Sequence, residues 1–210
     1  MRRTIVFAVV LVGLLLAYQG PASDHWAKQL QHVNGTVGYQ LRADGSDFKP
    51  VSDTVDLPDN GLAVTRAQSA AVLGLPDASR ISLGESTTLQ VGAFATTGFS
   101  RLTVVLDNGA LRFDVSAPTG DAADYELVTK TLQADVRGAI GLLANAGDIT
   151  MIGCLDCPPD SVTVTADNRT FTPRTGQYVA VTTAGAVATG LMNRRVLETF
   201  SSVDVPVDAP

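Results

Sequence analysis

The stretch Gly61–Val91, GLAVTRAQSAAVLGLPDASRISLGESTTLQV, decides the fold class of this chain. Polar and apolar residues alternate in Arg80–Leu83 and again in Thr87–Val91, and a period of two is typical of a strand with one buried face. Turn residues separate these strands at Pro76–Ser79 and at Gly84-Glu85. Short strands at such close spacing predict an all-β protein. The side chains predicted for the buried face are Ile81, Leu83, Leu89 and Val91.

Turn signals recur through the rest of the chain at the intervals of an all-β protein. The strongest hairpin signal is Asp107-Asn108-Gly109, which stands between the strand-like runs TVVL and ALRFDV. No helix of three turns is predicted between Gly35 and Val187, and no fixed repeat length is found in that range. The predicted fold is a twisted β-sandwich or an irregular β-solenoid-like coil, with short helical segments at the N- and C-terminal ends. The remaining turn signals are Asp44-Gly45, Pro58–Gly61, Pro118–Gly120 and Ala184-Gly185.

Composition excludes some classes of partner. The formal net charge is −6, and no basic stripe is found, so nucleic acid is not expected as a partner. Aromatic residues make up only 6% of the chain, which leaves little material for stacking bases or sugars. Hydrophobic residues reach 45%, enough to build the core of one domain.

The N-terminus has the layout of a secretory signal. A positive start, Met1–Arg3, precedes the apolar run Ile5–Ala17 and the small residues Gly20 and Ala22. We expect a signal peptide over residues 1–22, with cleavage before Ser23. The alternative is an uncleaved membrane anchor, but thirteen apolar residues rise only about 20 Å as a helix against a hydrocarbon core of about 30 Å. The mature chain is therefore expected outside the cytoplasm, in the periplasm or secreted, and it contacts a membrane only if this segment remains.

Two short helical segments are predicted beside the β domain. Residues 23–33 carry Trp26, Leu30 and Val33 at helical spacing, which favours a short amphipathic helix. Residues 193–200 favour one or two helical turns, within a C-terminal tail of residues 191–210 whose end is expected to be extended or disordered.

Five short motifs, in order, are similar to those of the FecR-like domain family. The resemblance covers about Val33 to Val187 and places the domain at residues 34–190. Two positions depart from the family pattern: Ala78 stands where the turn usually carries Gly, and Ala139 where Thr usually follows. The motifs are NGTVGY (34–39), LPDASRISLG with TTLQV (75–91), NGALRFDV (108–115), YELVTKTLQADVRGAIG (125–141) and GQYVAV (176–181). The motif residues, to which we assign structural roles, are Pro76, Asp77, Ser79, Ile81, Leu83, Gly84, Val136, Arg137, Gly138, Gly176 and Gln177.

The resemblance implies an extracytoplasmic module and a loose function. In the iron-uptake regulators, this module carries a signal from an outer-membrane transporter to a cytoplasmic anti-sigma segment. Only Met1–Arg3 precede the apolar run here, so we expect no such segment. The leading hypothesis is a binding or scaffolding module of the cell envelope that recognises an envelope protein or a surface polymer through exposed sheet edges. A self-associating structural component is the alternative, and an envelope enzyme is the least favoured.

Cys154 and Cys157 are the only cysteines, in the sequence CLDCPP. A redox dithiol or half of a metal site is possible for such a pair, but His25 and His32 lie far upstream and the Pro-Pro that follows does not open a helix. Export favours a disulfide. That bond requires the two residues to form a turn, since in an extended strand their Cα atoms would lie about 10 Å apart. We predict that titration of the unreduced, denatured protein finds no free thiol.

No enzyme signature is found. The chain has no Gly-x-Ser-x-Gly, no His-Glu-x-x-His and no phosphate-binding glycine loop, so no catalytic residue, cofactor or metal ligand is assigned. Arg137, in the most recognisable family motif, is a candidate ligand for an acidic group. Nothing else basic is near it in sequence, so we interpret it as an arginine tied to a carboxylate or to carbonyls at a strand end. Arg80 and Arg112 take the same structural interpretation.

Overall fold

The computed structural model describes residues 28–93, 101–116 and 124–203. The predicted signal peptide, residues 23–27 with Trp26, the turn at Pro118–Gly120 and the last seven residues lie outside these ranges. Seventeen strands, one short α-helix and one 3-10 turn occupy the described residues. The all-β prediction is confirmed.

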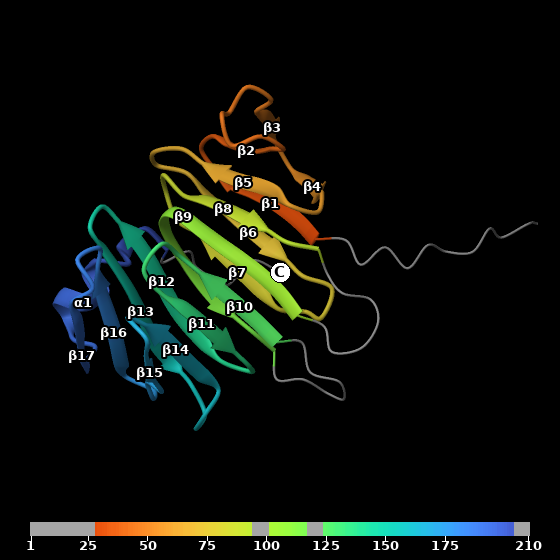
Figure 1. The fold of residues 1–210 in the computed structure, drawn as a ribbon. Coiled ribbons are helices and arrows are strands. Elements are labelled where there is room, and N and C mark those ends of the chain that lie inside the picture. Colours follow the sequence, from red (N-terminus) through yellow and green to blue (C-terminus); the bar gives the residue numbers. More distant parts are fainter. Residues whose placement is uncertain (1–27, 94–100, 117–123, 204–210) are drawn as a thin grey trace, which may run out of the picture.

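The strands form two sheets that share one strand, β9 (Arg101–Asp114) (Figure 1). The first sheet runs in the order β4 (Thr54–Leu57), β1 (Lys28–Asn34), β6 (Ala70–Gly74), β7 (Arg80–Leu83), β9, β12 (Ile140–Ala146), β13 (Ile149–Asp156), β16 (Gln177–Thr182) and β17 (Val187–Leu191). The second runs in the order β3 (Lys49–Val51), β2 (Val37–Gln40), β5 (Gly61–Thr65), β8 (Thr88–Val91), β9, β10 (Asp124–Val128), β11 (Gln133–Val136), β14 (Val162–Ala166) and β15 (Arg169–Phe171). All of these pairs are antiparallel except β9 with β10.

The chain builds the second half of both sheets from hairpins that alternate between them. The hairpins β10–β11 and β14–β15 belong to the second sheet, and β12–β13 and β16–β17 belong to the first. Neither sheet closes on itself, because β4 and β17 end the first and β3 and β15 end the second. The architecture is therefore an open β-sandwich in which the chain crosses repeatedly from one layer to the other.

One hydrophobic cluster fills the space between the two sheets. The face predicted from Gly61–Val91 contributes to it as expected, since Ile81, Leu83, Leu89 and Val91 are all 0% exposed. The first two belong to β7 and the last two to β8, so the predicted face is divided between the two sheets. Alternation along each strand turns every second side chain into this shared core.

The hairpin predicted at Asp107-Asn108-Gly109 is wrong, because β9 passes through these residues without turning. Its first half pairs with β8 and β10, and its second half pairs with β7 and β12, so the two flanking runs never pair with each other. The Asn-Gly signal instead marks a bulge: Thr88 pairs with Asn108 but Leu89 pairs with Leu106. Gly109, with φ of 100°, lets the strand change sheets there.

The helix predicted over residues 23–33 is also wrong for its described part, residues 28–33. These residues form β1, which pairs with β4 on one side and with β6 on the other. Leu30 is fully buried, and Lys28 is only 2% exposed because its ammonium reaches Asp59 Oδ1 at 2.5 Å and the Gly92 carbonyl at 2.7 Å. Pairing with distant strands satisfies the backbone of this segment, so tertiary contacts override its helical spacing.

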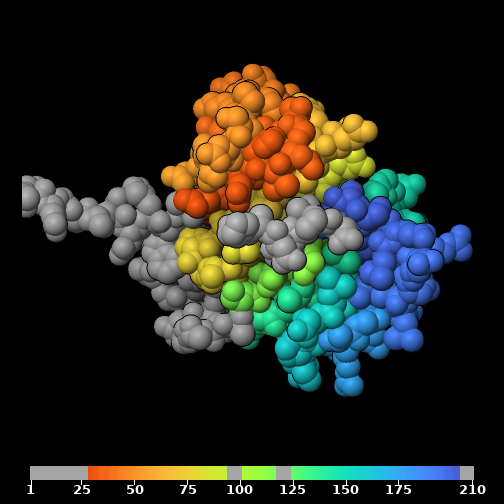
Figure 2. All heavy atoms as spheres, turned by 180° about the vertical axis from the view of Figure 1, so that it is seen from behind, coloured from red at the N-terminus to blue at the C-terminus, as the bar shows by residue number. Residues whose placement is uncertain are grey.

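The helical segment predicted near the C-terminus is confirmed as α1 (Arg194–Glu198), which the Asn193 side chain caps by accepting the Val196 N–H at 3.1 Å. It leads to the 3-10 turn Ser201–Val203. Phe200 and Val203 pack on the outer face of the first sheet, in a second, smaller cluster. Figure 2 shows this segment in dark blue on the rear of the molecule.

Candidate functional site

The four edge strands of the two sheets differ in how readily each could pair with an additional strand. An exposed edge is usually blunted by charge, proline or shortness. Strand β3 has three residues including Lys49 and Pro50, β15 has three including Arg169, and β4 carries Asp56. Strand β17 has five residues, VATGL, with no charge and no proline. Among the described edges it is the one best suited to accept an extended segment.

The hydrogen-bond register shows which groups of β17 face outward. Bonds of Thr182 N–H to the Ala186 carbonyl at 2.9 Å and of Met192 N–H to the Gly176 carbonyl at 2.8 Å flank the β16–β17 ladder. Hydrogen-bonded pairs alternate in an antiparallel ladder, so 186, 188, 190 and 192 bond to β16. The N–H and C=O groups of Val187, Thr189 and Leu191 therefore point away from the sheet.

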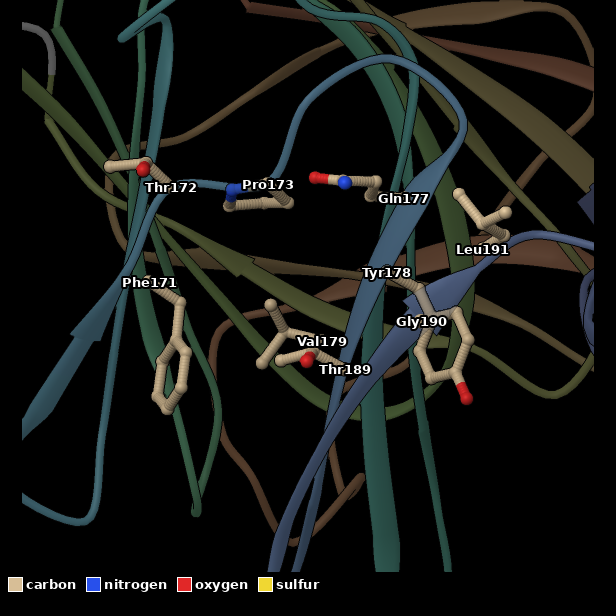
Figure 3. Close-up of a pocket in the computed structure, with 9 residues that line it drawn as sticks. All are labelled: Phe171, Thr172, Pro173, Gln177, Tyr178, Val179, Thr189, Gly190 and Leu191. Carbon is tan, nitrogen blue, oxygen red and sulfur yellow. The ribbon is translucent and has the colours of Figure 1, made fainter.

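A groove of about 300 Å³ lies beside this edge, at the end of the sandwich where β15 and β17 come last (Figure 3). Phe171 and Pro173 form one wall, and Tyr178 and Leu191 stand on the other. Leu191 is 71% exposed, the highest value among the large exposed hydrophobic residues described. An outward backbone ladder and a groove with aromatic walls thus lie side by side.

The family-motif turn Pro76–Ser79 lies away from this edge and performs a structural role. Asp77 Oδ1 accepts the Ser79 N–H at 3.0 Å, and Asp77 Oδ2 accepts the Tyr125 hydroxyl at 2.7 Å. Ser79 Oγ, fully buried, accepts the N–H of Ser116 at 3.0 Å. Burial, followed by the bond to Asp77, raises the pKa of the Tyr125 hydroxyl well above its usual value, while a contact with Ser79 opposes this shift. The turn therefore ties β6, β7 and β10 together.

Ile81, Leu83 and Val136 are core residues, and Gly84 lies under the C-terminal segment. Arg137 donates to Asp124 Oδ2 at 2.6 Å, and its side chain is 62% exposed. This hydrogen bond, with the charge of Asp124, raises the pKa of the Arg137 guanidinium. Gly138 has φ of 55°. Arg137 is thus paired with a carboxylate, as the structural interpretation expects.

Gly176 and Gln177 shape the turn that starts β16. Gly176 has φ of 80° and donates its N–H to the Cys154 carbonyl at 2.8 Å. The Gln177 side-chain oxygen accepts the Arg174 N–H at 2.9 Å. Gln177 lines the groove beside β17, together with Tyr178 and Val179 of the same motif.

Cys154 and Cys157 lie at disulfide distance, with their Cα atoms 5.6 Å apart. The approach comes from a bulge rather than from the expected turn: Ile140 pairs with Asp156 but Gly141 pairs with Cys154, which leaves Leu155 as an extra residue. Both cysteines are buried in the main core, at 0% and 4% exposure. The Thr175 hydroxyl oxygen accepts the Cys157 N–H at 2.9 Å, so the segment before β16 is fastened to the pair.

The motif residues are not brought together into one site, and sequence reasoning missed β17 and its groove. The signal that was available is the long uncharged run from Gln177 to Met192, which reads as a hairpin around Ala184-Gly185. Within the described ranges, no group of three or more His, Cys, Asp and Glu side chains is placed to hold a metal ion. No helix in those ranges combines the length and apolar character needed to cross a membrane.

Comparison with known proteins agrees with the three central motifs, whereas the motifs at residues 34–39 and 176–181 lie outside the matched range. The family model described as FecR protein matches residues 62–157. Two crystal structures of a candidate anti-sigma factor from Parabacteroides distasonis share the fold, with TM-scores of 0.54 and 0.56 at 14% and 13% identity. Each match covers 65% of this chain and 62% of the neighbour. No curated protein matches the sequence. Residues 62–157, from the second residue of β5 to Cys157, are therefore similar to the FecR family.

Proposed function

We propose that this chain is a non-catalytic, extracytoplasmic binding module of the bacterial cell envelope. Its β17 edge takes up an extended segment of a partner protein as an additional strand. The observation that carries the proposal is the uncharged, proline-free β17 beside the groove between Phe171 and Tyr178. The outward N–H and C=O groups of β17 supply affinity, and the groove selects the side chains of the incoming strand.

The FecR-like segment supports a sensor or scaffold role in place of catalysis, since FecR proteins are regulatory and their domains are typically extracytoplasmic. The groove fits that role, because its lining combines apolar side chains with the polar Thr172, Gln177 and Thr189 but includes no His, Asp, Glu, Lys or Cys, the side chains that most often act in catalysis. The partner favoured here is an envelope protein with an exposed strand or tail of alternating apolar residues. A surface polymer would lack the peptide groups that match the ladder.

The test removes one outward N–H of the edge. In Thr189→Pro the ladder to β16 is kept, because the Thr189 N–H does not point toward β16, whereas an incoming strand loses a hydrogen bond and meets the proline ring. A matched variant, Thr189→Val, keeps the N–H. A photo-crosslinking side chain at Leu191, introduced into each background in the native envelope, reports contact, and one at Thr54 on β4 is the positional control.

We expect a crosslinked product from Leu191 in the Thr189→Val background, its loss in Thr189→Pro, and no such product from Thr54. Equal crosslinking in both backgrounds would overturn strand addition. A product of twice the chain mass that the proline abolishes would instead establish self-association through β17, the structural role that the sequence analysis set beside partner binding.

A further inference from the structure

A second hollow, of about 550 Å³, lies between the outer face of the first sheet and the C-terminal segment. It is separate from the β17 groove, and no residue lines both. Its sheet side comes from β9, β12 and β13, and its cover comes from α1 and the residues up to Val203. The volume lies within the range of about 300–1,000 Å³ that is typical of small-molecule sites.

The interior of this hollow is apolar. Leu142, Phe200 and Val203 are buried at 6%, 2% and 2% exposure, and Leu155 is half-buried. The cover is incomplete, because α1 buries none of its own residues and Leu197 is 43% exposed. A segment that covers an apolar hollow only in part leaves room for an aliphatic chain.

The rim carries two arginines and one carboxylate. Arg112 of β9 lies between Ser82 of β7 and Leu142 of β12 in the strand register, and Arg194 begins α1. The five ion pairs of the described residues involve neither arginine, in contrast to Arg137. With Glu198 on the same rim, two positive charges and one negative charge leave a net charge of +1. That charge complements a single anionic group.

We propose that this hollow binds an aliphatic carboxylate, with the acyl chain against Leu142, Leu155 and Phe200 and the carboxylate at Arg112 and Arg194. Burial of the chain supplies affinity in proportion to its apolar area. Guanidinium groups pair with a carboxylate by two parallel N–H bonds, which gives the rim its preference for an anion. Arg112 is thereby a ligand-binding residue and not only the structural arginine that the sequence indicates.

Titration calorimetry of the purified protein with decanoate, decanol and decylamine, each below its micelle concentration, tests the inference. We expect decanoate to bind more tightly than decanol and much more tightly than decylamine. Arg112→Gln should weaken decanoate by about tenfold and leave decanol unchanged, because one charged hydrogen-bonding group is lost. Arg169→Gln, on β15 and away from the hollow, is the matched control and should change neither.

Amide chemical-shift mapping locates the site independently of the variants. Decanoate should shift residues around Arg112, Leu142 and Leu197 and leave β17 unchanged. Equal affinity for the three probes, shifts elsewhere, or an unchanged decanoate affinity in Arg112→Gln would each overturn the proposal. A chain ending at Val203 that binds decanoate when the full chain does not would mean that the last residues occupy the hollow, and this too would overturn it.

Discussion

Ala78 occupies the third position of the turn Pro76–Ser79 with φ of 66°, in the left-handed region. Its N–H donates to the Leu75 carbonyl at 3.0 Å, and the Leu75 N–H donates to the Ser79 carbonyl at 2.9 Å, so the angle is imposed by the turn on both sides. For an alanine this conformation costs about 1–2 kcal/mol. The glycine that the FecR-like pattern usually has here would avoid that cost.

We therefore expect Ala78→Gly to raise the free energy of unfolding by about 0.5–1 kcal/mol, because relief of the strained angle exceeds the added entropy of the unfolded chain. Ala67, exposed in another turn and not among the residues with positive φ, is the matched site. Ala67→Gly should lower stability by about 0.4–1 kcal/mol. Urea denaturation measures both changes, and the same sign at both sites would contradict the argument.

The hydroxyl of Tyr125, which is bonded to the turn Pro76–Ser79, makes the stability of the protein depend on pH. Burial and the bond to Asp77 raise the pKa of its hydroxyl above the ordinary value of 10.0, so the unfolded chain loses this proton first as the pH rises. The contribution of Tyr125 to stability is complete below pH 10 and falls above it, by about 1.4 kcal/mol per pH unit.

The free energy of unfolding, measured between pH 9 and 11, should fall as the pH rises. In Tyr125→Phe this decrease should be smaller by the contribution of one titrating group. Tyr178→Phe, at a half-exposed tyrosine that lines the groove, controls for the removal of a hydroxyl elsewhere in the fold. Equal slopes in the native protein and in Tyr125→Phe would show that the Tyr125 hydroxyl is not held as the contacts indicate.

At the scale of the elements, the position of the C-terminal segment depends on Gly84, which follows a strand far away in the sequence. A Cβ at Gly84, just after β7, would lie 2.6 Å from Ser202 Oγ and 2.9 Å from the Ser202 carbonyl. The absence of a side chain there lets the 3-10 turn approach the sheet, which in turn places Phe200 and Val203 in their cluster. A residue of the family motif thus positions the cover of the second hollow.

Gly84→Ala should displace this segment, because the contact is with backbone and overpacking costs about 1–3 kcal/mol. Trypsin cleavage after Arg194 and Arg195, both exposed, reports the displacement and should become faster in native buffer. In Gly74→Ala the new Cβ meets only the Gln29 carbonyl at 3.9 Å, so the cleavage rate should stay that of the unaltered chain. Unchanged cleavage in Gly84→Ala would mean that the segment is held by other contacts.

For the whole molecule, β9 is the strand on which both sheets depend. It pairs with β8 and β10 in one sheet and with β7 and β12 in the other. The crossing point is held by Asn145, whose amide donates to the Leu106 and Asp107 carbonyls at 3.1 and 2.7 Å. On the other side of the crossing point, Thr87 Oγ1 donates to the Ala110 carbonyl at 3.1 Å and accepts the Ala110 N–H at 3.2 Å. The two sheets should therefore unfold together.

Gly109→Ala tests this coupling, since a Cβ there would lie 2.3 Å from Thr87 Oγ1 and 2.6 Å from Thr87 Cα. We expect a loss of about 2–4 kcal/mol from the contact and the positive φ, with a single transition by far-UV circular dichroism and by tyrosine fluorescence. Gly147→Ala has φ of 59° but no atom within 4 Å, so it should lose only about 1–2 kcal/mol. Two separate transitions in Gly109→Ala would show that the sheets are independent.

Features that depend on neighbours along the chain could be predicted from the amino-acid sequence. Alternation identified Ile81, Leu83, Leu89 and Val91 as buried, and the apolar spacing in residues 193–200 predicted α1, because side-chain period acts over a few residues. Features that depend on strands distant in the sequence could be recognised only in the folded molecule. Strand β1 forms because β4 and β6 pair with it, and Asn108-Gly109 becomes a crossing because its flanks pair with different strands. Strand β17 is an open edge because none of the strands in the described residues lies beyond it. Pairing partners are set by the free energy of the whole core, and no local pattern records them.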